Sequence, residues 1–349
     1  MTGCDGAVAS RVVQWQQLHG RRHLPWQQTQ DPYRVWLSEI MLQQTQVGTV
    51  LGYYARFLER FPDMNSLANA SQDEVLALWS GLGYYSRARN LHRCAQVIVA
   101  EHDGIFPASA EMLAALPGIG RSTAGAIAAF CFGERTPILD ANVRRVLTRV
   151  LGFREDLAIA ANERKLWEQA SALLPQVDLH HSMPRYTQGV MDLGAMVCLP
   201  RKPQCVLCPL HSSCKARMQG DPENYPVKTR KVSRKSESWW LLIQRDPMER
   251  VWLHRRPSRG IWAGLHCLPV FPERQALLDQ IPREMLPGIF EMPAVLHVLT
   301  HRDLHLHPVQ VNAARFPLHS EEDGSWFERA QWQQLGLPAP VRRLLEDVT

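Results

Sequence analysis

The feature of this 349-residue chain that most restricts its fold is a group of four cysteines close together in sequence. Cys198, Cys205, Cys208 and Cys214 have the spacing C-x6-C-x2-C-x5-C. Four neighbouring thiolates would repel one another unless a metal held them. A single tetrahedral zinc usually takes two close cysteine pairs, and only one such pair is present. The longer gaps suit a cuboidal 4Fe-4S cluster, so we expect one, with zinc and unrelated core cysteines as the alternatives.

Composition and charge describe an ordinary globular protein with room for two or three domains. Hydrophobic residues make up 45% and charged residues 21% of the chain. The net charge of +5 allows a polyanionic partner, although a mild basic excess alone is weak support for one. No run approaches the ~20 apolar residues of a membrane span, and the N-terminus lacks a secretory pattern. We therefore expect no membrane partner and a cytoplasmic location, where the cysteines would not form a disulfide framework.

Hydrophobic periodicity divides the chain into a helical part and a mixed part. From Val12 to about Met218, apolar residues recur every three or four positions between Gly/Pro breaks, which predicts an all-α unit within residues 1–218. Residues 219–237 are rich in basic residues and poor in apolar ones, which predicts an exposed basic linker. Residues 238–349 are expected to form a separate C-terminal α+β domain, so the chain is predicted to be multidomain.

The C-terminal part contains short apolar runs whose pattern is typical of β-strands. Trp239–Ile243 and Val251–Leu253 flank a charged turn, which predicts a β-hairpin. Further strands are expected at Val295–Leu299 and Leu304–Val311. Helices are expected at Gln275–Ile281 and Pro340–Val348.

A short turn rich in glycine and proline interrupts the helical part. Leu116-Pro-Gly-Ile-Gly120 lies between two apolar helical stretches, which predicts a helix–hairpin–helix at about 111–132. Gly118 and Gly120 allow a sharp turn and a close approach to a partner. The free amides of the next helix, which begins near Arg121, would point at an anion such as a phosphate. About 20 residues further on, Asp140 opens another helix, where an Asp is often only an N-cap.

Together these motifs resemble a known family. The helix–hairpin–helix and the later Asp140 are the signature of the helix–hairpin–helix base-excision DNA glycosylases, and the cysteine tail is similar to their endonuclease III branch. Leu24-Pro-Trp26 followed by Val35–Gln46, together with Gly81–Asn90, narrows the resemblance to the MutY-type adenine DNA glycosylases. The similarity runs from about Trp15 to Cys214 and continues more loosely beyond.

The resemblance implies an enzyme of DNA base-excision repair. Such an enzyme hydrolyses the N-glycosidic bond of adenine mispaired with 8-oxoguanine or guanine in duplex DNA, after flipping the base out of the stack. The implied partner is double-stranded DNA with such a mispair, bound by a monomer that is cytoplasmic and associated with the nucleoid. The implied cofactor is one 4Fe-4S cluster.

Two carboxylates in different environments would serve this reaction, because the leaving adenine needs a proton and the sugar cation needs a negative charge. Glu39 lies in the apolar stretch 35–42, where burial would raise its pKa and suit it to act as a general acid. An exposed helical Glu is the ordinary alternative. By resemblance, Glu39 is the general acid and Asp140 stabilises the oxocarbenium or a transient covalent intermediate.

Position 122 separates two branches of the superfamily. Bifunctional glycosylase–lyases carry a lysine there, whereas this chain carries Ser122, which has no amine for a Schiff base. Ser122 could also cap the helix. We therefore expect a monofunctional enzyme. The alternatives are an endonuclease III-like enzyme acting on oxidised pyrimidines and a DNA-binding protein without catalysis; Ser122 disfavours the first, and the presence of both carboxylates disfavours the second.

The resemblance assigns further residues by position. The adenine pocket is expected to contain Arg22, Leu24, Trp26, Ser122, Asn142 and Asp192. Recognition of the opposite base is expected from Gln44, Thr45, Tyr84, Thr300 and His301. Contacts to the DNA backbone are expected from Gly118, Gly120 and Arg121.

The C-terminal part is similar to the Nudix-like domain that helps this family to recognise 8-oxoguanine. The family loop commonly reads Phe-Ser-His, and Leu299-Thr300-His301 keeps the hydroxyl and the imidazole but loses the Phe. Arg283-Glu284 is followed by Met-Leu-Pro-Gly, so the metal carboxylates of a Nudix hydrolase box are missing. We expect no nucleotide pyrophosphatase activity.

Overall fold

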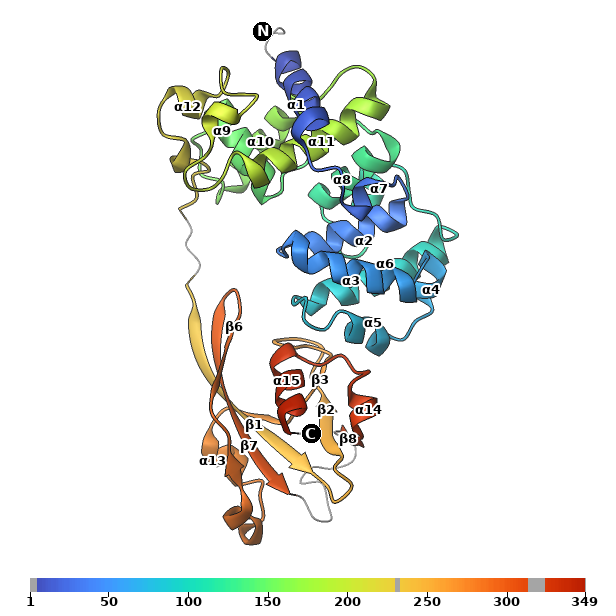
Figure 1. The fold of residues 1–349 in the computed structure, drawn as a ribbon, viewed down its shortest axis with the longest axis vertical. Helices are drawn as coiled ribbons and strands as arrows, with labels where there is room; N and C mark the ends of the chain where they lie inside the picture. The colour runs from blue at the N-terminus through green and yellow to red at the C-terminus, as the bar shows by residue number, and fades with distance from the viewer. Residues whose placement is uncertain (1–4, 230–232, 313–323, 349) are drawn as a thin grey trace. The chain divides into compact units, whose positions relative to one another are not determined.

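A computed structural model describes residues 5–229, 233–312 and 324–348 (Figure 1). The chain forms two compact units that interleave in sequence. The first unit contains Met1–Val50, Asp63–Asn65 and Arg93–Lys231, and the second contains Leu51–Pro62, Ser66–His92 and Val232–Thr349. Part of the helical region therefore clusters with the C-terminal domain, a division that differs from the linear boundaries expected at 218 and 238. Among the described residues, no helix is both long and apolar enough to cross a membrane.

Helices build the whole of the first unit, and helices α3, α4 and α6 pass from one unit into the other. In chain order the helices of the helical region are α1 (Asp5–His19), η1 (Pro25–Gln27), α2 (Pro32–Leu42), α3 (Val47–Arg60), α4 (Met64–Ala68), α5 (Gln72–Leu78), α6 (Tyr85–Glu101), α7 (Ala110–Ala114), α8 (Arg121–Phe132), α9 (Ala141–Leu151), α10 (Ala160–Ala172), α11 (Leu179–Met196), η2 (Cys205–Leu207), α12 (Lys215–Met218) and η3 (Pro222–Asn224). The predicted helix–hairpin–helix is confirmed as α7, a turn and α8.

The core of the first unit is formed where α1, α8 and α9 pack against α11. Helix α9 shows why its sequence is helical. Val143, Val146, Leu147 and Val150 recur three or four positions apart, so all four lie on one face and are buried. Gly152 ends this helix in the left-handed conformation. The buried face fixes the rotation of α9 about its axis and thereby the direction in which its first residues point.

A mixed sheet forms the core of the C-terminal domain, the part of the second unit from residue 233 onward. The described strands follow the order β3-β2-β1-β7-β5, while β4 pairs with β1, β6 with β7 and β8 with β2. They are β1 (Lys235–Arg245), β2 (Val251–Arg255), β3 (His266–Cys267), β4 (Val270–Phe271), β5 (Phe290–Glu291), β6 (Val295–Val298), β7 (Arg302–Asn312) and β8 (Gly324–Phe327). Helices α13 (Arg274–Leu278), η4 (Arg283–Gly288), α14 (Arg329–Trp332) and α15 (Ala339–Val348) complete the domain. This architecture confirms the predicted fold class.

Most of the C-terminal elements were expected. Strands β1 and β2 form the predicted antiparallel hairpin, and β6, β7, α13 and α15 lie where strands and helices were predicted. The parallel pairing of β1 with β7, which runs from Lys235 opposite Arg302 to Arg245 opposite Asn312, was not predicted. Strand β8 and helix α14 were also missed, because neither is long enough to show a period.

The segment predicted as an exposed linker, 219–237, contains residues that are attached to each of the two units. Tyr225 is 2% exposed and belongs to the core of the first unit. The amide of Leu157 donates to the carbonyl of Val227 at 3.1 Å. At the other end, Lys235 already belongs to β1. Part of this range is therefore attached to the units, which composition does not reveal, and an exposed linker over 219–237 stays a prediction.

Candidate active site

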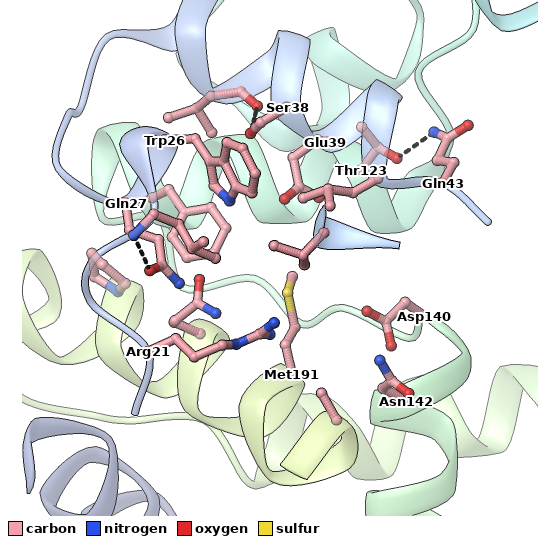
Figure 2. A pocket seen from close by; sticks show the side chains of 18 of the residues that line it. Arg21, Trp26, Gln27, Ser38, Glu39, Gln43, Thr123, Asp140, Asn142 and Met191 are labelled. Carbon is pink, nitrogen blue, oxygen red and sulfur yellow. Dashed lines mark hydrogen bonds between the residues drawn. The ribbon is translucent and has the colours of Figure 1, made fainter. Parts of the chain in front are cut away.

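A cavity of about 1120 Å³ lies in the first unit, and we call it the central cavity (Figure 2). Its walls come from η1, α2, α8, α11 and the start of α9. Most of the residues predicted for catalysis and the adenine pocket line it, together with two predicted to recognise the opposite base. They are Arg22, Leu24, Trp26, Glu39, Gln44, Thr45, Ser122, Asp140 and Asn142. Predicted residues from four separate segments therefore meet around one space.

Glu39 enters the cavity from α2. Asp31 caps this helix by accepting a hydrogen bond from the amide of Tyr33 at 3.0 Å, and Pro32 occupies the first turn. The neighbours of Glu39 in the helix are almost all buried apolar residues. Burial, and to a smaller extent the charge of Asp140, raises the pKa of Glu39 from 4.5 to about 8. The carboxyl is consequently protonated at neutral pH and can donate a proton.

Asp140 faces the same cavity from the N-terminus of α9 (Figure 2). Its Oδ1 accepts a hydrogen bond from the amide of Val143 at 2.7 Å, so Asp140 is the N-cap that the sequence suggested. Burial raises its pKa, whereas the amides of Val143 and Asn142 and the charges of Arg145 and Arg144 act in the opposite direction. Unlike Glu39, Asp140 thus has donors and cations that favour its ionised form.

Helix α8 holds the segment before Asp140 in place. The hydroxyl of Ser122 accepts a hydrogen bond from the amide of Leu139 at 3.0 Å. One helix turn on, a Cβ on Gly125 would come within 2.6 Å of the carbonyl oxygen of Pro137, so only glycine permits this approach. The N-cap of α8 is Gly120, which corrects the suggestion that Ser122 caps the helix. Ser122 instead links the hairpin to the residue preceding Asp140.

The hairpin before α8 has the conformation that its glycines predict. Gly118 has a φ of 78°, a value that favours glycine, and Ile119 anchors the turn in the core with 4% exposure. The N-cap of α8 is Gly120, and no side chain accepts a hydrogen bond from the backbone amides of the first turn. The guanidinium of Arg121 lies 4.0 Å from the centre of the Trp167 ring.

Asp192, expected in the adenine pocket, does not line the central cavity. It is fully buried, and its carboxylate accepts hydrogen bonds from the Nε of Arg21 at 2.7 Å and the backbone amide of Arg21 at 2.9 Å. Gln188, one turn earlier on α11, donates from its Nε2 to the same carboxylate at 2.9 Å. Gln188 and Arg21 do line the cavity. Asp192 thus fixes Arg21 and Gln188, which face the cavity, and its own place in the adenine pocket stays a prediction.

Two further glutamines on the cavity wall were not predicted. The Oε1 of Gln27 accepts a hydrogen bond from the amide of Leu24 at 3.4 Å, while its buried Nε2 has no partner among the described residues. The Nε2 of Gln43 donates to the hydroxyl of Thr123 at 3.3 Å. Gln43 lies within the motif 35–46, but polar residues in a motif give no sign of which ones face inward.

The residues expected to recognise the opposite base fall into two groups. Gln44 and Thr45 line the central cavity of the first unit, whereas Tyr84, Thr300 and His301 belong to the second unit. The hydroxyls of Tyr84 and Thr300 share a hydrogen bond. Gln44 and Tyr84 both adopt left-handed backbone conformations, with φ values of 57° and 48°. Such conformations are strained in residues other than glycine and concentrate at functional sites.

The four cysteines line one small cavity beside α9 and the end of α11. None forms a disulfide. Burial, followed in smaller measure by the nearby thiolates, raises the pKa of Cys208 to about 12 and also raises that of Cys214. Within the described ranges, no group of three or more His, Cys, Asp or Glu side chains has an arrangement that could hold a metal ion. The four cysteines nevertheless line the same cavity, where four ionised thiolates would repel one another.

Two arginines connect the first cysteine to α9. The Nη1 of the buried Arg149 donates to the Sγ of Cys198 at 3.2 Å. The Nε of Arg145 donates to the carbonyl of Cys198 at 2.8 Å, and its Nη2 donates to the Oδ1 of Asn142 at 2.9 Å. Two successive turns of α9, whose N-cap is Asp140, are therefore hydrogen-bonded to Cys198.

Comparison with known proteins gives two family matches and closely similar full-length relatives. Residues 37–171 match the HhH-GPD superfamily of base excision DNA repair proteins, and residues 238–347 match the NUDIX domain. The adenine DNA glycosylase of Buchnera aphidicola subsp. Acyrthosiphon pisum is 37% identical over 96% of this chain and 96% of its own length. The human adenine DNA glycosylase is 33% identical over 80% of this chain and 62% of its own length.

Among solved structures, a thermostable thymine-DNA glycosylase aligns with a TM-score of 0.54 at 27% identity. The alignment covers 62% of this chain and 97% of that one.

Proposed function

The chain belongs to the adenine DNA glycosylases, enzymes of base-excision repair that remove adenine from DNA, and we propose that its substrate is adenine mispaired with 8-oxoguanine or guanine in duplex DNA. One observation carries the mechanism that we propose. Glu39 and Asp140 line one cavity, and burial raises the pKa of both, to about 8 for Glu39, but only Asp140 has backbone amides and arginine charges that favour its ionised form. Two carboxyls that differ in this way divide the roles of acid and anion between them.

The proposed reaction begins with adenine inside the central cavity. Protonated Glu39 gives its proton to a ring nitrogen of the base, and the electrons of the glycosidic bond leave with the base. Asp140, as a carboxylate, stabilises the positive charge that develops on the sugar. The oxygen of a water molecule then bonds to the anomeric carbon. One proton of that water stays on the new hydroxyl, and the other goes to the carboxylate of Glu39. Ser122 supplies no amine, so no Schiff base forms and the DNA strand stays intact.

Adenine reaches this cavity only if it leaves the helical stack. Leu24 and Trp26 provide apolar walls for a flat base, and Arg22, Ser122 and Asn142 provide polar contacts. The amides of Gln27 and Gln188 also face the cavity. The unpaired Nε2 of Gln27 is free to donate to a ring nitrogen of adenine, which would relieve the cost of a buried unsatisfied donor.

We propose that Gln44, Thr45, Tyr84, Thr300 and His301 take part in recognising the opposite base. Hydroxyl, amide and imidazole groups can hydrogen-bond to the edge of a base, and a tyrosine ring can stack on it. The DNA backbone would bind at Gly118, Gly120 and Arg121, where the first amides of α8 can donate to a phosphate.

We propose that Cys198, Cys205, Cys208 and Cys214 hold one 4Fe-4S cluster. Four cysteines that line one cavity, with the guanidinium of Arg149 donating to the sulfur of Cys198, suit an anionic thiolate-bound cluster by their chemistry. When bound, the cluster would cross-link the loop 198–214 and offset the mutual repulsion of the thiolates. Purified protein should be brown, because the iron–sulfur cluster would absorb at about 400 nm. A colourless protein with one equivalent of zinc would refute the assignment.

A single-turnover assay on matched duplexes tests the substrate. Adenine opposite 8-oxoguanine and opposite guanine should be released, while adenine opposite thymine and thymine opposite guanine should not. Strand cleavage should require subsequent alkali, because the enzyme is monofunctional. Release of thymine, or nicking without alkali, would contradict the proposal.

A further inference from the structure

Side chains at the two ends of the loop Trp79–Gly83, which precedes Tyr84, donate hydrogen bonds to its backbone. The Nε1 of Trp79 donates to the carbonyl of Gly83 at 3.1 Å. The Nη2 of Arg87 donates to the carbonyls of Leu82 and Gly83 at 3.1 and 3.2 Å, and its guanidinium lies over the ring of Tyr84. These bonds fix the loop that sets Tyr84 in its left-handed conformation.

The same loop is also held by the C-terminal domain, within the second unit. The hydroxyl of Ser80 donates to the carbonyl of Leu337 at 3.0 Å. The phenol of Tyr85 donates to that same carbonyl at 3.0 Å. The Nε of Arg342, on α15, donates to the hydroxyl of Ser80 at 3.3 Å. Residues on both sides of Tyr84 therefore bind one short segment of the C-terminal domain.

Arg342 also shapes the segment that it presents. Its Nη1 donates to the carbonyl of Gln333 at 3.1 Å, and its Nη2 donates to that of Leu335 at 2.8 Å. One guanidinium thus joins Ser80 to the turn that carries the Leu337 carbonyl. Since a guanidinium is planar and keeps its charge, its donors hold the three acceptors in a fixed arrangement.

Two further contacts attach the same helices to the C-terminal domain at a distance from the loop. The Nη1 of Arg89 donates to the carbonyl of Ala263 at 2.6 Å. Arg255 pairs with Asp73 at 2.5 Å. The attachment therefore does not depend on Arg342 alone, so removing that guanidinium should loosen the loop without separating the two parts.

We propose that Arg342 is a positioning residue for recognition of the opposite base: through Ser80 it fixes the loop that carries Tyr84 and so presents Tyr84 and Thr300 as one preorganised pair. The inference rests on the proposed function, in which these two residues contact the opposite base. A pair that is already ordered loses less freedom on binding, so more of the contact energy remains for discrimination. The hydrogen bond between the two hydroxyls is the contact that depends on this arrangement.

The experiment compares Arg342→Met, which keeps an apolar stem, with Arg343→Met, the exposed neighbour on α15. Dissociation constants are measured for duplexes containing a slowly cleaved 2′-fluoro adenosine opposite 8-oxoguanine or guanine. The rate of adenine release is measured at saturating enzyme on the ordinary duplexes. Arg342→Met should lose about tenfold of the preference for 8-oxoguanine, as expected for one hydrogen bond to a charged group, with the saturated rate unchanged. Arg343→Met should match the wild type.

An Arg342→Met variant that keeps the wild-type preference would overturn the inference, as would an equal loss of affinity for both duplexes. A wild type with no preference for 8-oxoguanine would instead overturn the proposed function and the inference with it. If Arg342→Met does not fold, Ser80→Ala removes the hydroxyl that Arg342 binds and carries the same test. Tyr85→Phe should shift the preference in the same direction, because it removes the second bond to Leu337.

Discussion

Replacing Glu39 with glutamine should strongly slow base release and at the same time stabilise the fold at alkaline pH. Burial raises the pKa of Glu39 from 4.5 to about 8, so the folded chain opposes ionisation of this carboxyl. At ~1.4 kcal/mol for each pH unit, the difference corresponds to about 5 kcal/mol. Glu39 faces an open cavity, where water screens part of this effect, so we expect a gain of about 2–4 kcal/mol.

The change in stability with pH depends on the ionisation of Glu39 in the folded and the unfolded chain. Below pH 4.5 the carboxyl is protonated in both the folded and the unfolded chain, so Glu39 imposes no penalty. Between pH 4.5 and about 8 it ionises only in the unfolded chain, and the stability of the wild type falls relative to the variant. Above about pH 8 the difference is constant.

Chemical denaturation at pH 5 and pH 8.5 measures this effect, with Glu168→Gln as the matched control because Glu168 is an exposed residue of α10. Glu39→Gln should gain stability between the two pH values, and Glu168→Gln should not. In single-turnover assays Glu39→Gln should bind the mispaired duplex and lose about 10²–10⁴-fold in base release. A variant with no extra stability at pH 8.5, or with undiminished turnover, would refute the reasoning.

Four other outcomes follow from the site. The single-turnover rate of the wild type should fall as the pH rises through about 8, since Glu39 then loses the proton it donates; a rate that is flat from pH 7 to 9.5 would contradict this. Asp140→Asn should slow base release by about 10²-fold or more and leave binding of the mispaired duplex in place, and an unchanged rate would remove Asp140 from the mechanism. Ser122→Lys should give an adduct trapped by borohydride, because an amine would face the sugar; no adduct would leave the cavity geometry unsupported. Thr300→Ala should weaken the preference for 8-oxoguanine over guanine more than it slows adenine release, and equal losses for both partners would exclude a discriminating role.

Local patterns in the sequence were enough to identify the family and the chemical groups. The cysteine spacing, the glycines of Leu116–Gly120 and the apolar stretch around Glu39 are features of short segments, and each reports a local conformation or a local environment. The same holds for the β1–β2 hairpin, whose strands are joined by a short turn. For these features the residues that interact are close in sequence, so periodicity and turn residues suffice to predict them.

Only the tertiary structure decided which distant groups meet. Asp192 was expected in the pocket, but it pairs with Arg21, 171 positions away, and a sequence gives no sign of that partner. Tyr84 is hydrogen-bonded to Thr300, 216 positions away. Strand β1 pairs with the distant β7 as well as with the adjacent β2. The pKa of Glu39 also depends on burial by the folded chain and on the charge of Asp140, 101 positions away. Periodicity shows which face of a helix or strand is buried, whereas the packing of the whole chain determines what that face contacts.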